Sequence, residues 1–149
     1  MKKIQLTQGM VALVDDDDYE YLKLISWHAT IKNRGHYYVQ NGMVGLMHRF
    51  IMGAPAGKVI DHIDHNPLNN QKTNLRICDI GNNAMNRCTR NKTGFKGVYI
   101  NNNGSIMSLI NVNRKRLYLG AFNNIDDAAR AYNKAASKYY GEYAMLNEV

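Results

Sequence analysis

Hydrophobic and polar positions divide the 149-residue chain into three zones, residues 1–45, 46–90 and 91–149. Short apolar runs, several of them alternating with polar residues, are separated by clusters of Asn, Asp, Gly and Lys. Such clusters are typical of turns between short elements. The pattern predicts an α+β protein, and the longest helical repeat lies near the C-terminus.

The first zone predicts a strand, an acidic turn, a short helix and one or two further strands. The strand is Met10–Val14, the helix lies within residues 19–27, and the last strands lie around residues 36–40. Asp15–Asp18 can begin the helix, because carboxylates are favourable near a helix N-terminus. A metal site formed by the same four residues is the alternative.

The second zone predicts a strand, a polar loop, a second strand and a short helix. The strands are residues 58–63 and 75–78, and Asp79 can cap the helix of residues 79–87. A hairpin folded against this helix could bring four polar side chains to one point: Asp61, His62, Asn74 and Asn83. Asn69 and Asn70, in the loop, are interpreted as turn residues that bond their own backbone.

The third zone predicts a three-stranded antiparallel sheet followed by one amphipathic helix. The strands are residues 95–100, 106–113 and 116–122. Asn124, with an acidic residue three positions later, resembles a capping box, and Gly141 is a natural helix end. Four apolar or aromatic residues are predicted to lie in the core of the third zone: Ala128, Tyr132, Ala135 and Leu146.

The net charge of +7 comes from one stretch of the sequence, residues 87–118. This stretch has no acidic residue and seven basic ones, Arg87, Arg90, Lys92, Lys96, Arg114, Lys115 and Arg116. The other 12 of the 19 basic residues balance the 12 acidic ones. A local excess of this kind indicates a surface that binds a polyanion, and a solvated basic linker is the alternative.

Three observations limit the class of protein. No run of 18 apolar residues occurs, and no apolar segment follows the N-terminal lysines, so we expect neither a membrane span nor a secretory signal, and an intracellular location. Cys78 and Cys88 form no CxxC pair, which argues against a zinc knuckle. Two free thiols are expected, with a disulfide as the alternative.

The segment DHIDHNPLNNQKTNLR, followed by NNAMNR, resembles the HNH endonuclease motif. The resemblance covers residues 46–90 and implies the ββα-metal (His-Me finger) fold; the preceding MHRFIM is similar to phage and intron-borne members. It implies that His62 is the general base and that Asn74 braces the loop and orients His62. It also implies that Asp61 and Asn83 are metal ligands. Oxygen ligands favour Mg²⁺ or Mn²⁺, and no zinc is expected.

Two histidines near this motif have no implied role. His65 stands where similar sequences often have glycine, and we interpret it as a surface residue, with a phosphate contact as the alternative. We interpret His48 as structural or as a neighbour of the site. The first zone is expected to pack on the nuclease zone, and contact of its Lys32, Tyr37 and Tyr38 with DNA is the alternative.

The third zone resembles the AP2 domain, a DNA-binding domain whose sheet lies in the major groove. The resemblance covers residues 91–147 and rests on GFKGVYI, RLYLGAF and DDAARAYNKAASKYYGEYAMLN. It implies base or phosphate contacts from the sheet and its turns by Lys96, Tyr99, Asn111, Asn113, Arg114, Lys115 and Arg116. Asn111 and Asn113 are assigned only by their alternation. Gly104–Ile106 lacks the tryptophan that many members carry there, and Tyr99 replaces a frequent arginine, so the sequence read could differ.

Together the two resemblances predict a DNA endonuclease of the phage homing type that binds double-stranded DNA without a small-molecule cofactor. One active site per chain predicts a monomer or weak dimer that nicks one strand. A catalytically silent DNA-binding regulator is the alternative, and a nuclease that is RNA-directed or nonspecific is a third hypothesis.

Overall fold

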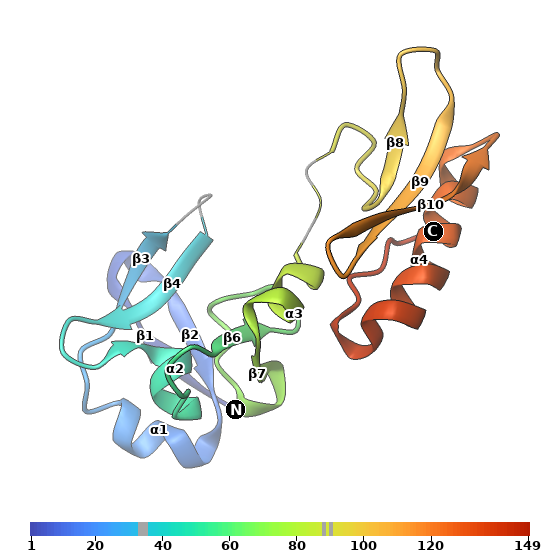
Figure 1. Cartoon of the computed structure of the whole chain (residues 1–149). Helices are drawn as coiled ribbons and strands as arrows, with labels where there is room; N and C mark the ends of the chain where they lie inside the picture. The colour runs from blue at the N-terminus through green and yellow to red at the C-terminus, as the bar shows by residue number, and fades with distance from the viewer. Residues whose placement is uncertain (33–35, 88, 90) are drawn as a thin grey trace. The chain divides into compact units, whose positions relative to one another are not determined.

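The computed structural model describes residues 1–32, 36–87, 89 and 91–149 (Figure 1). The chain divides into two compact units, Met1–Asn83 and Ala84–Val149. The thiol of Cys88 and the basic side chain of Arg90 lie outside the described residues, as do the side chains of Lys32 and His36. No helix in the described ranges is long and apolar enough to cross a membrane.

The first unit contains three small antiparallel sheets, β1-β2, β3-β4-β5 and β6-β7. Its strands are β1 (Lys2–Gln5), β2 (Val11–Val14), β3 (His28–Lys32), β4 (His36–Asn41), β5 (Gly45–Leu46), β6 (Val59–His62) and β7 (Leu75–Cys78). The helices are η1 (Thr7–Gly9), α1 (Asp16–Leu22), α2 (Met47–Met52), η3 (Lys72–Asn74) and α3 (Ile80–Met85), which reaches two residues past the unit boundary. Residues 63–74, called the connecting loop below, join β6 to β7.

Nine buried residues of the N-terminal elements form the core of the first unit. They are Ile4, Leu6, Ala12, Val14, Leu22, Trp27, Ala29, Val39 and Met47. Trp27 also donates its indole N–H to the carbonyl of Leu22 at 2.9 Å, which satisfies its polar atom inside the core. Met47 comes from α2, so the core joins the N-terminal strands to the helix before β6.

The acidic run begins a helix, as the sequence predicts, but not all of it is solvated. α1 starts at Asp16 with Asp15 as the N-cap residue, yet the carboxylate of Asp15 makes no capping bond to α1. The side chain of Asp18 is buried, with 2% exposed. Among the described residues, no group of three or more His, Cys, Asp or Glu side chains could hold a metal ion.

Several short elements of the first unit, η1, β5 and η3 among them, are absent from the sequence prediction, and β1 and α2 are the longest of them. β1 pairs with β2 from Lys2↔Val14 to Gln5↔Val11, although its sequence KKIQ has one apolar residue. α2 was treated only as the lead-in to the motif. Both are short, so their positions depend on tertiary packing more than on intrinsic preference.

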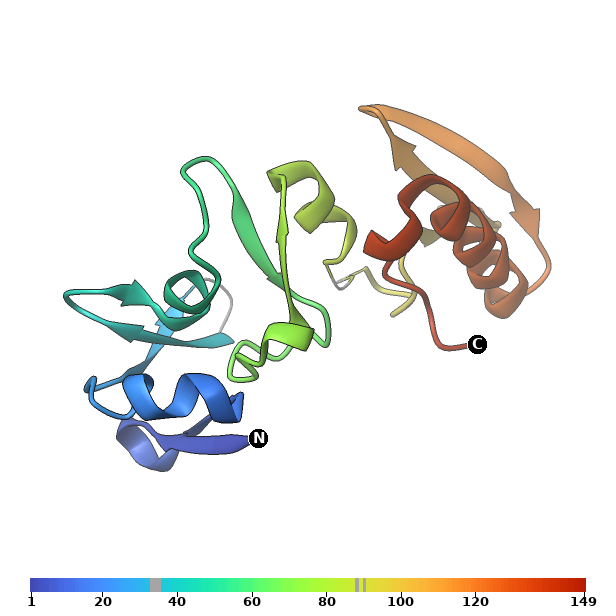
Figure 2. The same ribbon diagram turned by 90° about the horizontal axis from the view of Figure 1, so that it is seen from below.

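The second unit is a three-stranded antiparallel sheet with one long helix, the architecture that the sequence predicts. The strands β8 (Val98–Ile100), β9 (Ile106–Val112) and β10 (Lys115–Phe122) have the order β10-β9-β8. α4 (Ile125–Tyr140) is followed by η4 (Gly141–Tyr143) and runs along one side of the sheet in both views (Figure 2). Asn124 caps α4 by accepting the backbone N–H of Asp127 at 2.8 Å, as predicted.

The core of the second unit follows the alternation of its strands. Val98, Ile110 and three helical residues, Ala128, Tyr132 and Ala135, are buried between sheet and helix. Leu146 was predicted to join them, but 45% of it is exposed, because the segment after η4 forms no further regular element.

The hairpin between β9 and β10 differs from the prediction at two residues, because Asn113 lies outside β9 and Lys115 already belongs to β10. β9 ends at Val112, which pairs with Lys115, so Asn113 and Arg114 form a two-residue turn. Their φ values are 50° and 64°, as this type of hairpin turn requires. The prediction that Asn111 and Asn113 alternate on one face of a strand is therefore wrong, because Asn113 lies in the turn and not in the strand.

Candidate active site

The β6–β7 hairpin holds two of the predicted site residues next to each other. Its register pairs Asp61 with Arg76 and His62 with Leu75, and both Asp61 and His62 have 7% of their surface exposed. Arg76 donates from Nε at 2.9 Å and from a terminal nitrogen at 2.7 Å to Oδ2 of Asp61. The carboxylate of Asp61 is therefore held in a partly buried ion pair across the hairpin.

Asn74 fastens the connecting loop from within. Its Oδ1 accepts the backbone N–H of Asp64 at 3.0 Å, and its Nδ2 donates to Oδ1 of Asp64 at 2.8 Å and to the carbonyl of Asn69 at 2.9 Å. The backbone N–H of Ile63 donates to the carbonyl of Asn74 at 2.9 Å. One buried asparagine thus ties both ends of the loop together, directly after His62.

The carboxylate of Asp64 is a second group, besides the side chain of Asn74, that holds the connecting loop in place. Burial raises its pKa, but hydrogen bonds from the backbone of Asn66 and from the side chains of Asn69 and Asn74 outweigh this and lower it. Asp64 is therefore an anion that organises the loop. No role was predicted for Asp64 from the sequence motif.

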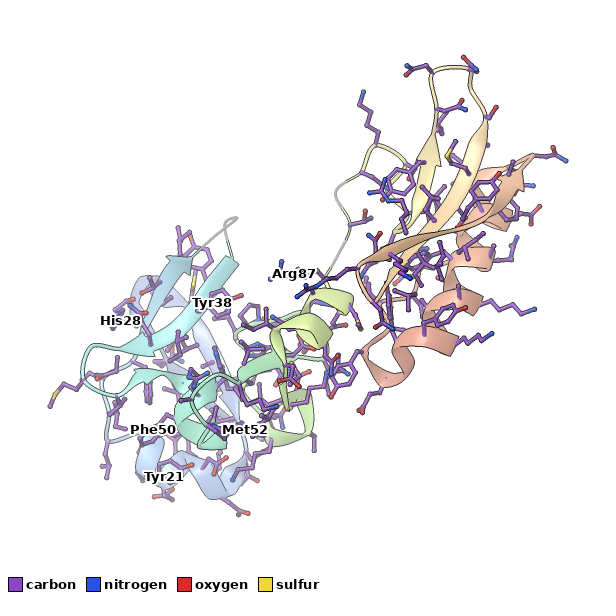
Figure 3. The ribbon with its side chains drawn as sticks, in the orientation of Figure 1. Tyr21, His28, Tyr38, Phe50, Met52 and Arg87 are labelled. Atoms are coloured by element: carbon purple, nitrogen blue, oxygen red, sulfur yellow. The ribbon has the colours of Figure 1, made fainter. Side chains whose placement is uncertain are left out.

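The imidazole of His62 lies in a group of three rings. The ring of His48 is 5.0 Å from that of His62 between centroids, with an interplanar angle of 85°. Tyr38 is 6.5 Å from His62 and 6.1 Å from His48, both in edge-on geometry. His48 comes from α2 and Tyr38 from β4, where Figure 3 labels it. Two elements that precede β6 therefore enclose the ring of His62.

Burial lowers the pKa of His62 below its ordinary value. The neighbouring side chain of Asn70 and the negative charge of Asp64 act in the opposite direction but do not cancel it. The imidazole is therefore neutral near pH 7 and able to accept a proton. Asn70 has no exposed surface, and its side-chain amide donates to the backbone carbonyl of Pro67 at 3.3 Å, a local bond of the kind expected of a turn residue.

Asn83 is half-buried on α3. The thiol of Cys78, a residue of β7, has neighbours in both this helix and the hairpin. Burial raises the pKa of Cys78, the negative charge of Asp61 raises it further, and the backbone N–H of Asn83 lowers it. The Cys78 thiol thus lies near the backbone of Asn83 and within reach of the charge of Asp61. Cys78 is a free cysteine, as expected.

Two further predicted details of this zone can be compared with the structure. Asp79 precedes α3 as expected, but its carboxylate pairs with Lys58 at 2.8 Å. His65 has φ of 62°, in the left-handed region that glycine adopts freely, which explains why similar sequences often have glycine there.

The residues predicted to contact DNA lie at different places in the second unit. Tyr99, Asn111 and Arg116 are exposed on strands, where Asn111 pairs with Arg116, and Lys115 begins β10. Lys96 precedes β8 and is not in the strand. Its ammonium group donates to the backbone carbonyls of Met85 and Arg87, the latter at 2.7 Å.

Comparison with known proteins agrees with this geometry. Residues 50–85 match the family model described as HNH endonuclease. The chain is 28% identical over 157 residues to an uncharacterized HNH endonuclease of Acanthamoeba polyphaga mimivirus, and the alignment covers 95% of this chain and 77% of that protein. No solved structure matches the chain significantly. Residues 50–85 are therefore similar to an HNH endonuclease domain, and both matches support a nuclease over a catalytically silent regulator.

Proposed function

We propose that this protein is a metal-dependent DNA endonuclease that hydrolyses one phosphodiester bond per binding event. The observation that carries the proposal is the placement of a buried, neutral imidazole, His62, beside a loop braced by Asn74 in a segment that matches the HNH family.

His62 is the general base in this proposal. Its neutral ring takes a proton from a water molecule, whose oxygen forms a bond to phosphorus while the bond to the 3′ oxygen breaks. The departing 3′ oxygen takes up a proton, and the phosphate stays on the 5′ end. Asn74 contributes by holding the loop that follows His62, since its three side-chain hydrogen bonds set the path of residues 64–69.

Asp61 and Asn83 are the proposed metal ligands. A carboxylate and a side-chain amide oxygen are hard donors that suit Mg²⁺ or Mn²⁺, and the nearby Cys78 thiol is not needed as a ligand. When bound, the ion would supply Lewis-acid neutralisation of charge at the scissile phosphate. Oδ2 of Asp61 is bonded to Arg76, which orients the carboxylate and limits its freedom.

The second unit is proposed to bind duplex DNA in the manner of an AP2 domain. Support comes from its three-stranded sheet with one helix and from exposed polar and aromatic residues, Tyr99, Asn111, Asn113, Arg114, Lys115 and Arg116. The bonds of the Lys96 ammonium to two backbone carbonyls favour a structural role for that residue instead. A phage homing enzyme is the corresponding biological class, and a monomer with one site would nick.

A supercoiled-plasmid assay tests the proposal. The wild-type chain is expected to produce nicked circles with Mg²⁺ or Mn²⁺ and none with EDTA. His62→Ala should nick at least ~10²-fold more slowly, the contribution expected of a general base. Asn83→Ala should be similarly impaired, and Asn83→Asp, which keeps an oxygen ligand, should retain more activity. Equal nicking by His62→Ala and wild type would overturn the assignment of the base.

A further inference from the structure

The connecting loop is held from outside as well as from within. Its residues Leu68, Asn70, Gln71 and Lys72 all bond to a short stretch at the junction of β2 and α1, residues 13–18. These contacts join parts of the chain more than fifty residues apart. They involve residues before the segment that matches the HNH family.

The first part of this contact is made by backbone. The N–H of Leu13 donates to the carbonyl of Leu68, and the N–H of Asn70 donates to the carbonyl of Leu13, both at 2.8 Å. Leu13 and Asn69 form a parallel bridge. β2 therefore sets the position of Asn70, the fully buried residue whose side chain neighbours His62.

The second part is made by Asp15. Its Oδ2 accepts the backbone N–H of Lys72 at 2.8 Å, and its Oδ1 accepts the side-chain amide of Gln71 at 3.1 Å. Lys72 begins η3, and Asn74 ends it. The carboxylate of Asp15 thus holds the one-turn helix that delivers Asn74 to the loop, rather than capping α1.

Asp18 supports the same contact from one helical turn further on. Its buried Oδ1 accepts from the ammonium of Lys72 at 2.6 Å and from the hydroxyl of Tyr21 at 2.7 Å. Burial, then the hydrogen bond to Asp18 and its negative charge, raise the pKa of Tyr21 to about 12, and the hydrogen bond to Asp18 raises the pKa of Lys72. Asp16 and Asp17, between them, are exposed, and Asp17 makes no hydrogen bond to the described residues of the connecting loop. The acidic run therefore presents two carboxylates to the loop and leaves two exposed.

We propose that Asp15 is a positioning residue of the nuclease centre, acting through the backbone of Lys72 on Asn74 and, together with Leu13, on the loop that neighbours His62. The inference rests on the proposed function for its kinetic consequence. Removing the carboxylate leaves the N–H of Lys72 and the amide of Gln71 without their acceptor and loosens η3. The chemical step slows because Asn74 no longer holds the loop, while DNA affinity is unchanged because Asp15 is not one of the residues proposed to contact DNA.

The test combines kinetics with amide hydrogen exchange on the full-length chain. Asp15→Ala is compared with Asp15→Asn, which keeps one oxygen acceptor, and with Asp17→Ala, which removes the same charge two positions away but no bond to the loop. Asp15→Ala is expected to lower kcat about 10- to 100-fold, as loss of a supporting hydrogen bond does at metal sites, with KM and DNA affinity unchanged. Its Lys72 amide should exchange at least ~10-fold faster, because the bond that protects it is gone.

Asp15→Asn should restore most of kcat and of the Lys72 protection, and Asp17→Ala should resemble wild type in both. Wild-type kcat in Asp15→Ala, or an equal loss of kcat in Asp17→Ala, would overturn the proposal. Unchanged exchange at Lys72 in Asp15→Ala would also overturn it. If the wild-type chain does not nick DNA, the proposed function fails, and the exchange at Lys72 still decides whether Asp15 holds η3.

Discussion

The two units hold their important side chains by different physical means. In the first, Asp61, His62 and Asn74 are each less than 9% exposed, and they are surrounded by ion pairs, hydrogen bonds and rings from distant parts of the chain. In the second, the candidate DNA contacts stand on the solvent side of a sheet whose other side packs on α4. The first region depends on satisfied polar groups, and the second on alternation and apolar packing.

This difference predicts that substitutions in the first unit mainly change folding stability, whereas substitutions of exposed residues in the second unit mainly change binding. A buried polar network is costly when one member is removed, because its partner loses a hydrogen bond or a countercharge that water cannot replace. An exposed contact residue can be removed at little cost to folding, and its loss appears in binding. Variants in each region can therefore separate the two kinds of support.

The largest effect is expected from Arg76→Leu in the β6–β7 hairpin. The change leaves the partly buried carboxylate of Asp61 without its countercharge, and we expect a loss of about 3 kcal/mol in the free energy of unfolding. The double variant Asp61→Val with Arg76→Leu removes both charges and should recover most of this loss. Urea unfolding of the single and double variants measures both values. Equal instability of the two would show that the ion pair is not what supports the hairpin.

A comparable effect in the second unit should come from packing alone. Gly97→Ala would place a Cβ 2.0 Å from the ring of Tyr132 and 2.7 Å from the carbonyl of Leu109. Gly104→Ala has a similar φ, +78° against +75°, but meets nothing within 4 Å. We expect Gly104→Ala to cost about 1 kcal/mol from backbone strain and Gly97→Ala about 3 kcal/mol. Thermal unfolding should separate them clearly, and similar melting temperatures would contradict the close packing of Gly97 on α4.

The smallest effect is expected from an exposed cation of the sheet. Lys115→Ala should leave the melting temperature unchanged and reduce the slope of log K against log salt by roughly 0.9, the value for one phosphate contact. Lys134→Ala removes an equal charge from the exposed side of α4 and is the matched control. Fluorescence anisotropy with duplex DNA at several salt concentrations measures both. Identical slopes for the two variants would argue against binding through the β9–β10 hairpin.

Sequence predicts the second unit better than the surroundings of the active site, and the reason is the range of the contacts. The capping of α4 by Asn124 and the tight hairpin that joins β9 to β10 depend on neighbours a few positions away. The motif also predicts that Asp61, His62 and Asn74 lie close together, because β6 and β7 pair as one hairpin.

The residues that surround His62 could not be inferred in this way. Tyr38 reaches it from β4, and Asp15 reaches Lys72 across 57 positions. His48, on α2, was interpreted as structural or a neighbour of the site, but its ring contact with His62 was not predicted. Their local patterns, an alternating strand, a short apolar helix and an acidic turn, are compatible with many packings. The burial of Asn70 beside His62 was missed for a related reason. An asparagine in a polar loop indicates a turn, but this pattern does not show whether the residue is buried.

The bonds between residues 13–18 and the connecting loop also bear on how the chain folds. Contacts separated by 54 to 57 positions require closure of a long segment before any of them contributes. The second unit has one comparable closure, because the side chain of Asn147 bonds to the backbone of Lys96, 51 positions away, but its three strands are joined by short hairpins. The connecting loop should therefore order after the β8–β9–β10 hairpins in a refolding chain. During synthesis, a ribosome-bound chain would remain without a nuclease centre until α3 had emerged.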